Sequence, residues 1–269
     1  MNDESQSVAF ADAPSFAPAA ARPGRLERAI RAARDALLGQ QQADGHWVYE
    51  LEADCTIPAE YILMMHYLDE IDPALEQRLA RYLREQQQSE GGWPLYHGGA
   101  LDLSCTVKAY FALKLAGDSP DAEHMQRARA AILARGGAAR TNVFTRIALA
   151  LYGEVPWRAV PYIPVEIMLL PRWFPFHLEK VSYWSRTVMV PLFVLCTLKP
   201  RARNPRRIDI RELFVTPPEH ERHYFHLPGE GSTLARVFFT LDRVFRLIDP
   251  LIPGPMRRHA IARAEAWTL

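Results

Sequence analysis

Glu60 is the ionisable residue whose surroundings in the sequence are most unusual. It directly precedes the apolar run Tyr61-Ile62-Leu63-Met64-Met65, which is typical of a buried helix. A carboxylate among apolar side chains is costly unless it is paired, so its presence there favours a functional role. A structural role has equal weight, because Glu60 follows Pro58 near an expected helix start, where a negative charge stabilises the helix dipole.

Other ionisable residues fit surface positions better than a reactive site. The acidic pairs Glu52 with Asp54 and Asp69 with Glu70 lie at expected turns or helix ends. A histidine cluster lacks the His-Glu-x-x-His spacing that places two metal ligands on one helix face, and we assign no metal to it. It consists of His220, His223 and His226 with Glu221, between Pro217-Pro218 and Pro228-Gly229.

A spaced motif, Leu-x3-Gln-x3-Gly-x-Trp, occurs twice and is expected to organise the helices on which Glu60 and the other candidate residues lie. Its two copies are separated by 46 positions: Leu37, Gln41, Gly45 and Trp47 return as Leu83, Gln87, Gly91 and Trp93. Glycine permits a positive φ in such a turn, and the tryptophan ring offers a flat surface for the glutamine amide. We therefore expect helix-pair repeats in which each turn fastens neighbouring helices together.

The helices on either side of the motif differ in polarity. Segments beginning near Leu26 and Leu75 carry apolar residues on one face and predict outer helices, whereas residues 61–68 and 109–113 are apolar on most sides and predict inner helices. Asp72-Pro73 and Ser119-Pro120 each predict a helix start, with an N-cap side chain followed by proline. A third helix pair is expected over Pro120–Ala134 and Val143–Tyr152, without a tryptophan turn.

The rest of the chain contains a proline-rich connection, a helix, a basic loop and one amphipathic segment. A proline-rich aromatic connection spans residues 156–176 and leads to a helix expected near Leu178–Leu198, and a basic loop follows over residues 199–231. Residues 233–252 predict a helix with one apolar stripe and arginines elsewhere, which suits a membrane surface or packing on the protein. The stripe contains Leu234, Val237, Phe238, Leu241, Val244, Phe245 and Ile248, and the arginines are Arg236, Arg243 and Arg246, with Arg257 and Arg258 following.

Composition indicates a globular protein with a sizeable core. The chain has 269 residues, 49% of them hydrophobic and 23% charged, and its net charge of +1 gives no general attraction to nucleic acid. Three cysteines without metal-ligand spacing favour a reducing, cytosolic environment. Residues 1–24 lack the features of a signal peptide and are expected to form a disordered leader, and no apolar run reaches the about 20 residues of a membrane span.

Several segments together resemble the squalene-hopene cyclases, particularly the proteobacterial ones, from about Arg25 to the last residue. They are the two Gln-Gly-Trp turns, residues 164–171 (PVEIMLLP), residues 143–146 (VFTR) and residues 182–187 (SYWSRT). The resemblance implies an all-α protein, an α/α toroid of concentric inner and outer helices that is incomplete relative to the full two-barrel cyclase. Residues 25–60 would then belong to the terminal part of the toroid, and residues 61–269 to an α/α barrel domain.

The resemblance also implies an activity, the cyclisation of squalene to hopene or hopanol by alkene protonation and a carbocation cascade, with no cofactor. Protonating an alkene requires a strong, desolvated acid, which this family places in an Asp-x-Asp-Asp motif. That motif is absent from the sequence. The chain therefore contains no catalytic acid, matches the N-terminal part of a cyclase, and should be inactive alone.

Further site residues are carried over from the resemblance. Trp184 matches an active-site tryptophan that faces the polyene, Phe144 an aromatic residue of the cavity wall, and Glu60 a glutamate that orders water where the last cation is quenched. Val181 and Met189 match positions of the substrate channel. For Trp184, Phe144, Val181 and Met189, ordinary core packing remains the alternative.

The chain departs from the family at the water network. Lys108 stands where some members carry an acid, Asn142 where some carry an arginine, and Ala148 where some carry a tryptophan. A Glu60–Lys108 pair is therefore one option for this end of the cavity.

The expected partners follow from the substrate, which is almost insoluble in water. We expect squalene or a similar polyisoprenoid, peripheral attachment to the cytoplasmic side of the cell membrane through residues 233–252, and either a homodimer or association with a C-terminal half. Two other functions remain open: a non-catalytic lipid-binding or partner-binding helical scaffold, and a cyclase of another isoprenoid.

Overall fold

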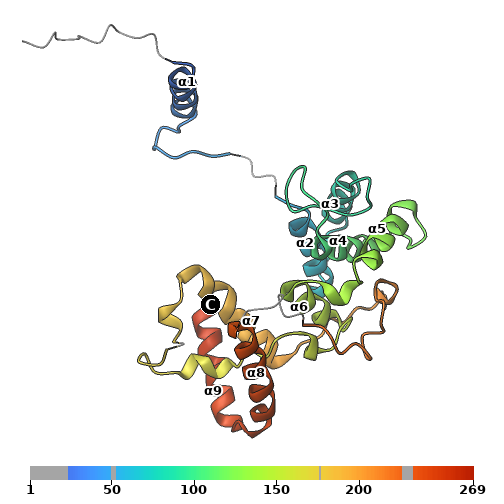
Figure 1. Cartoon of the computed structure of the whole chain (residues 1–269), viewed down its shortest axis with the longest axis vertical. Coiled ribbons are helices and arrows are strands. Elements are labelled where there is room, and N and C mark those ends of the chain that lie inside the picture. Colours follow the sequence, from blue (N-terminus) through green and yellow to red (C-terminus); the bar gives the residue numbers. More distant parts are fainter. Residues whose placement is uncertain (1–23, 50–52, 176, 226–232) are drawn as a thin grey trace, which may run out of the picture. The chain divides into compact units, whose positions relative to one another are not determined.

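The computed structural model describes residues 24–49, 53–175, 177–225 and 233–269 (Figure 1). These residues form nine α-helices joined by turns and short 3-10 helices, without a β-strand among them, and the predicted all-α class is confirmed. The α-helices are α1 (Arg25–Gly39), α2 (Thr56–Leu68), α3 (Pro73–Glu85), α4 (Leu103–Leu115), α5 (Glu123–Ala134), α6 (Val143–Tyr152), α7 (Tyr183–Leu198), α8 (Thr233–Ile248) and α9 (Gly254–Thr268). The predicted leader, apart from Gly24, and His226 lie outside the described residues.

The chain divides into two compact units, Met1–Glu52 and Ala53–Leu269. In the first unit, α1 and the following turn are exposed at every described residue. The turn is nevertheless well formed, because the Trp47 indole N–H donates to the Leu37 carbonyl at 2.7 Å and the Gln41 amide donates to the Gly45 carbonyl at 2.7 Å. Gly45 has φ +92°, as predicted for this position.

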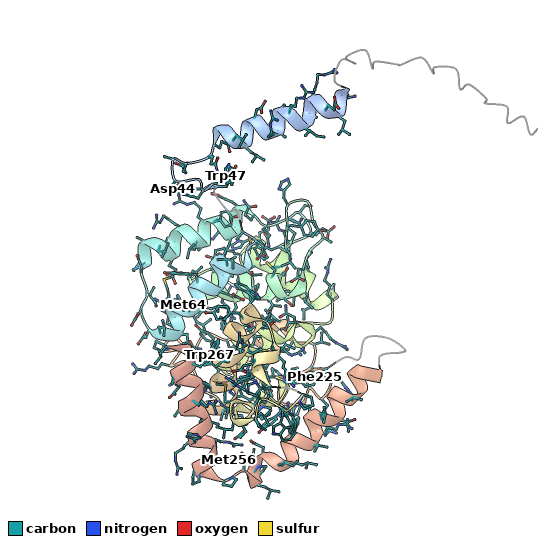
Figure 2. The ribbon with its side chains drawn as sticks, turned by 90° about the vertical axis from the view of Figure 1, so that its left-hand side faces the viewer. Asp44, Trp47, Met64, Phe225, Met256 and Trp267 are labelled. Carbon is teal, nitrogen blue, oxygen red and sulfur yellow. The ribbon has the colours of Figure 1, made fainter. Side chains whose placement is uncertain are left out.

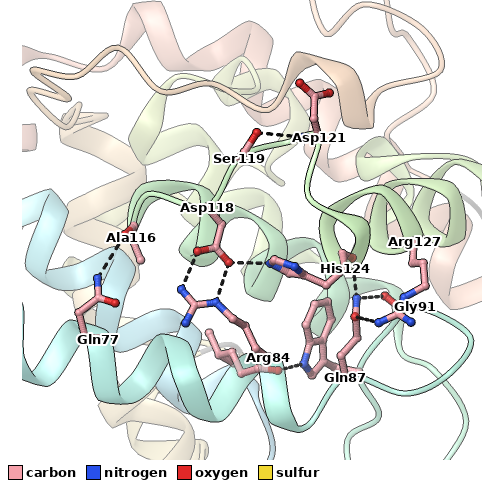
Figure 3. A network of polar contacts seen from close by, with 12 residues as sticks. Gln77, Arg84, Gln87, Gly91, Ala116, Asp118, Ser119, Asp121, His124 and Arg127 are labelled. Atoms are coloured by element: carbon pink, nitrogen blue, oxygen red, sulfur yellow. Dashed lines mark hydrogen bonds and ion pairs between the residues drawn. The ribbon is translucent and has the colours of Figure 1, made fainter.

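The second copy of the motif lies in the larger unit and contacts the next outer helix (Figure 3). The Trp93 indole is fully buried and donates to the Leu83 carbonyl at 2.7 Å. The Gln87 amide donates to the carbonyls of Gly91 and His124, both at 2.8 Å, and the Arg127 guanidinium donates to the Gln87 side-chain oxygen at 2.9 Å. This turn therefore fastens the end of α3 to α5, as the repeat predicts.

A first hydrophobic core is built around α4, which is buried along almost its whole length and packs against α2, α3, α5 and α6. α3 buries one face only and begins after Asp72, whose carboxylate accepts from the backbone N–H groups of Ala74 and Leu75. Both results agree with the predicted inner and outer helices.

Two expectations about this core are wrong. α5 begins at Glu123 instead of Pro120, because the Ser119 hydroxyl accepts from the N–H of Asp121 in a separate turn before the helix. α2 is only half enclosed, since four apolar side chains at helical spacing remain 43 to 56% exposed on one face. They are Ile57, Tyr61, Met64 and Leu68, of which Met64 is marked in Figure 2.

A second hydrophobic core joins α7, α9 and the 3-10 turn Val165–Leu169 of the proline-rich connection. Its buried members are Val165, Met168, Val190, Phe193, Ala260 and Ala264. α7 starts at Tyr183 instead of near Leu178, because residues 178–180 form a separate 3-10 turn and the Ser182 hydroxyl caps the helix by accepting from the N–H of Ser185.

α8 ends at Ile248, and the short 3-10 helix Asp249–Leu251 completes the segment predicted as helical to residue 252. None of the helices in the described part of the chain has the length and apolarity needed to cross a membrane.

Candidate functional site

Glu60 lies near the start of α2 and forms an ion pair with Lys108 of α4, the pairing that the sequence left open. The Lys108 ammonium group donates to the Glu60 carboxylate at 2.6 Å. Their exposures differ: the side chain of Lys108 is 7% exposed, whereas that of Glu60 is 47% exposed. The expectation that Glu60 is enclosed by its apolar neighbours is therefore wrong, because the face of α2 that carries Ile57, Tyr61 and Met64 is open.

Asn142 and Phe144 lie together at the start of α6. The Asn142 side chain caps this helix by accepting from the N–H of Thr145 at 2.9 Å, and its backbone N–H donates to the Ser104 hydroxyl of α4 at 2.9 Å. Phe144 is 57% exposed. The helix start is thus fixed against α4 while its aromatic side chain points away from the core.

Trp184 lies in the first turn of α7 and is 79% exposed. The neighbouring Tyr183 ring has its centroid 6.4 Å from that of Trp267 on α9, and the Arg186 guanidinium lies 5.7 Å from the Tyr183 ring centroid. Met189, one turn further along, is half-buried against the second core, and Val181 is half-buried before the helix. The structure therefore brings together Glu60 with Lys108 and Asn142 with Phe144, while Trp184 stands on a separate, open helix start.

The chemical capacity of these residues is the stabilisation of charge, not proton donation. A tryptophan or phenylalanine face attracts a cation, and a carboxylate paired with an ammonium group can order water. On α2 the exposed apolar side chains Ile57, Tyr61, Met64 and Leu68 share one face of the helix, which is typical of a surface that another element covers.

Glu154 is a buried acid that the sequence interpretation missed. It follows the left-handed Gly153 that ends α6, is 8% exposed, and accepts from the backbone N–H of Ile210 at 3.0 Å. Burial raises the pKa of Glu154 from 4.5 to about 7, and nearby Asp209 adds to the increase, while the Ile210 hydrogen bond, Lys114 and Arg211 oppose it. An acid directly after a helix-ending glycine was the available signal in the sequence.

The amphipathic helix α8 keeps part of its predicted apolar stripe exposed. Among its described side chains, Val237, Val244, Phe245 and Ile248 are 38 to 47% exposed, and Leu251 just beyond it is 78% exposed. The side chains of Leu234, Arg236 and Phe238 lie outside the described residues.

Two of the arginines that lie outside the apolar stripe, Arg246 and Arg257, are engaged within the protein. The Arg246 guanidinium donates to the Asp242 carboxylate at 2.7 Å and to the Val160 carbonyl at 2.6 Å. Arg257 donates to Glu166 at 2.9 Å and to Asp249 at 2.5 Å. Arg243 and Arg258 remain exposed.

Comparisons with known proteins agree with this helical organisation. The family model described as the squalene-hopene cyclase N-terminal domain matches residues 30–269. The chain is 54% identical to a squalene-hopene cyclase of Bradyrhizobium diazoefficiens over 244 residues, which are 90% of this chain and 37% of the relative. It is 56% identical to that of Zymomonas mobilis, over 88% of this chain and 35% of the relative, and 38% identical to that of Alicyclobacillus acidocaldarius, over 94% and 38%.

The chain thus spans little more than a third of the length of these curated relatives. Its matched residues include every α-helix from α2 to α9. The chain belongs to the squalene-hopene cyclase family and corresponds to its N-terminal domain.

Proposed function

We propose that this chain forms the N-terminal part of a cyclase that converts squalene to hopene or hopanol, and that it supplies one wall of the substrate cavity. The observation that carries this proposal is the family match over residues 30–269. The open aromatic residues support it, because a carbocation cascade needs apolar, π-rich walls that water does not reach.

Within this wall, each candidate residue has a separate role. Trp184 and Phe144 present ring faces to developing positive charge, an interaction worth roughly 1 to 2 kcal/mol when desolvated. The Glu60–Lys108 pair, together with Asn142, orders water where the last cation is quenched, and Val181 and Met189 line the channel by which the substrate enters.

The catalytic acid is supplied by residues outside this sequence. The chain has no Asp-x-Asp-Asp motif. Glu60 and Glu166 are paired with cations, Asp72 caps a helix, and Glu154 accepts a hydrogen bond from the backbone N–H of Ile210. The 269-residue chain is therefore inactive by itself, and its open apolar faces on α2, α6 and α7 are covered by the remainder of the cyclase or by a second copy of the chain.

The membrane is the source of substrate in this proposal. Squalene partitions into bilayers, and the exposed apolar side chains of α8 with Leu251 suit a peripheral attachment on the cytoplasmic side of the cell membrane. Binding of the chain to lipid vesicles tests this part separately from the chemistry.

Activity is tested by joining the chain in frame to the remaining part of the Bradyrhizobium diazoefficiens relative and incubating the fusion with squalene. We expect hopene, detected by mass spectrometry, from the fusion and none from the 269-residue chain. Trp184→Ala in the fusion should lower the rate about tenfold through loss of cation stabilisation.

Trp173→Ala is the matched control, because Trp173 is 78% exposed and Trp184 is 79% exposed. An equal loss in both variants would contradict the role of Trp184. A fusion that folds and binds squalene but releases no hopene would favour the non-catalytic scaffold, and release of other ring systems would favour a cyclase of another isoprenoid.

A further inference from the structure

A pocket of about 470 Å³ opens beside the 3-10 turn Ala138–Arg140, away from the residues considered above. It is lined by Arg140, Thr216, His220, Glu221, Arg222, His223 and Phe225. Phe225 is marked in Figure 2. The volume lies in the range of pockets that hold small molecules.

Residues 216–225 form one side of this pocket, and contacts with neighbouring side chains hold this loop in place. The Arg158 guanidinium donates to the carbonyls of Glu219 at 2.6 Å and Pro218 at 3.2 Å. The buried Tyr224 hydroxyl also donates to the Pro218 carbonyl, at 2.9 Å, and the Arg146 guanidinium lies 5.1 Å from the Phe225 ring centroid. The loop therefore has a defined shape without a ligand.

The charges that line the pocket are mostly positive and unneutralised. The side chains of Arg140, Arg222, His220 and His223 have no hydrogen-bond or ion-pair partner among the described residues. Glu221 is the acid in the lining, and its carboxylate accepts from the backbone N–H of His223 at 2.6 Å. The lining thus contains two guanidinium groups and two imidazoles beside one carboxylate that already accepts a hydrogen bond.

We propose that this pocket binds a phosphate group. Guanidinium forks match phosphate oxygens in pairs, and a tetrahedral phosphate can accept from donors on several sides, whereas a carboxylate offers only two oxygens. The group belongs either to a free phosphate or diphosphate or to the headgroup of a phospholipid. This site does not depend on the proposed cyclase activity.

The proposal is tested by titrating the 269-residue chain with inorganic phosphate and pyrophosphate, followed by calorimetry and phosphorus NMR. Replacing both arginines (Arg140→Gln with Arg222→Gln) should weaken binding by at least about tenfold. Arg81→Gln removes one positive charge from an exposed position on α3 and should leave binding unchanged. Glu221→Gln keeps the acceptor for the His223 N–H but removes the negative charge, so it should tighten binding.

Vesicles separate the two sources of the phosphate group. The chain is mixed with phosphatidylcholine vesicles that either contain or lack phosphatidic acid. Binding of free phosphate or pyrophosphate that is lost in the double arginine variant supports a soluble ligand, and binding only to phosphatidic acid vesicles, lost in the same variant, supports a headgroup. The proposal is overturned if neither probe is weakened more by the double variant than by Arg81→Gln, or if Glu221→Gln weakens binding.

Discussion

Glu60 and Lys108 carry opposite charges in unequal surroundings, so their removal should have unequal effects. Glu60→Gln leaves the ammonium group of Lys108, only 7% exposed, without a counter-charge and should lower the free energy of unfolding by about 1 to 2 kcal/mol. Lys108→Met keeps the volume of the aliphatic stem and leaves a carboxylate that is 47% exposed and solvated, so the loss should be less than about 1 kcal/mol. Urea unfolding of both variants measures the difference, and a larger loss for Lys108→Met would contradict the expectation that the uncompensated, buried ammonium group carries the greater cost.

Glu154 should make the stability of the chain depend on pH. Its pKa is raised from 4.5 in the unfolded chain to about 7 in the fold, mainly by burial, so the folded state holds more protons between these values. The free energy of unfolding should therefore fall as the pH rises from about 4.5 to about 7, by roughly 3 kcal/mol at most.

Glu154→Gln should remove this dependence, because the amide oxygen still accepts from the Ile210 N–H and carries no charge. The variant should equal the parent near about pH 4 and be more stable above about pH 7, as measured by urea unfolding at each pH. If the free energy of unfolding changes with pH in the same way in both proteins, the pH dependence does not arise from Glu154.

The two Gln-Gly-Trp turns offer a comparison at the level of the element. Gly45 and Gly91 have nearly equal φ angles, +92° and +90°, but a Cβ at Gly45 would meet only the Gln41 amide, at 3.8 Å, whereas a Cβ at Gly91 would lie 2.6 Å from the Arg127 carbonyl oxygen. Gly91→Ala should therefore add a backbone clash with α5 to the strain of a left-handed alanine, costing about 3 kcal/mol against about 1 kcal/mol for Gly45→Ala. Thermal unfolding followed by circular dichroism measures both, and equal losses would mean that the contact with α5 relaxes freely.

The repeat, the alternation of outer and inner helices, and the Asp72 cap could be predicted because they depend on local spacing alone. The start of α5 could not, because Ser119-Pro120 has the composition of a helix start but is used for a separate turn before Glu123. The open face of α2 was also missed. Apolar residues on most sides of a helix do not reveal which neighbours the described part of the chain supplies.

At the candidate site, the sequence left the Glu60–Lys108 pair as an option, and the structure contains it. The burial of Glu154 and the internal partners of Arg246 and Arg257 depend on contacts between segments far apart in the chain, such as Glu154 with Ile210 and Arg257 with Glu166. Such contacts leave no trace in local composition. The roles of Trp184, Phe144, Val181 and Met189 toward a substrate stay predictions.

At the scale of the molecule, the larger unit combines well-packed helices with apolar surface that is not covered. Its two cores are built on α4 and on the contact of α7 with α9, yet Tyr61, Phe144 and Trp184 remain open. This contrast is expected of a domain that forms one side of a cavity. The side that faces other helices of the same domain is packed, and the side that would face a hydrocarbon substrate or a further domain is apolar and exposed.

Attachment to a membrane is the prediction that concerns the molecule as a whole. Leu247 and Leu251, at the end of α8 and just beyond it, are 77% and 78% exposed, so replacing them should not disturb either core. Transfer of leucine side chains into the bilayer interface should dominate binding to uncharged vesicles, where headgroup charge contributes little. Leu247→Asp with Leu251→Asp should lower the fraction of the 269-residue chain that floats with phosphatidylcholine vesicles by at least about tenfold.

Leu95→Asp, at a 46% exposed loop position outside α8, is the control and should float like the parent chain. If the control loses as much binding as the double variant, attachment is not made through α8, and the substrate must reach the protein by another surface.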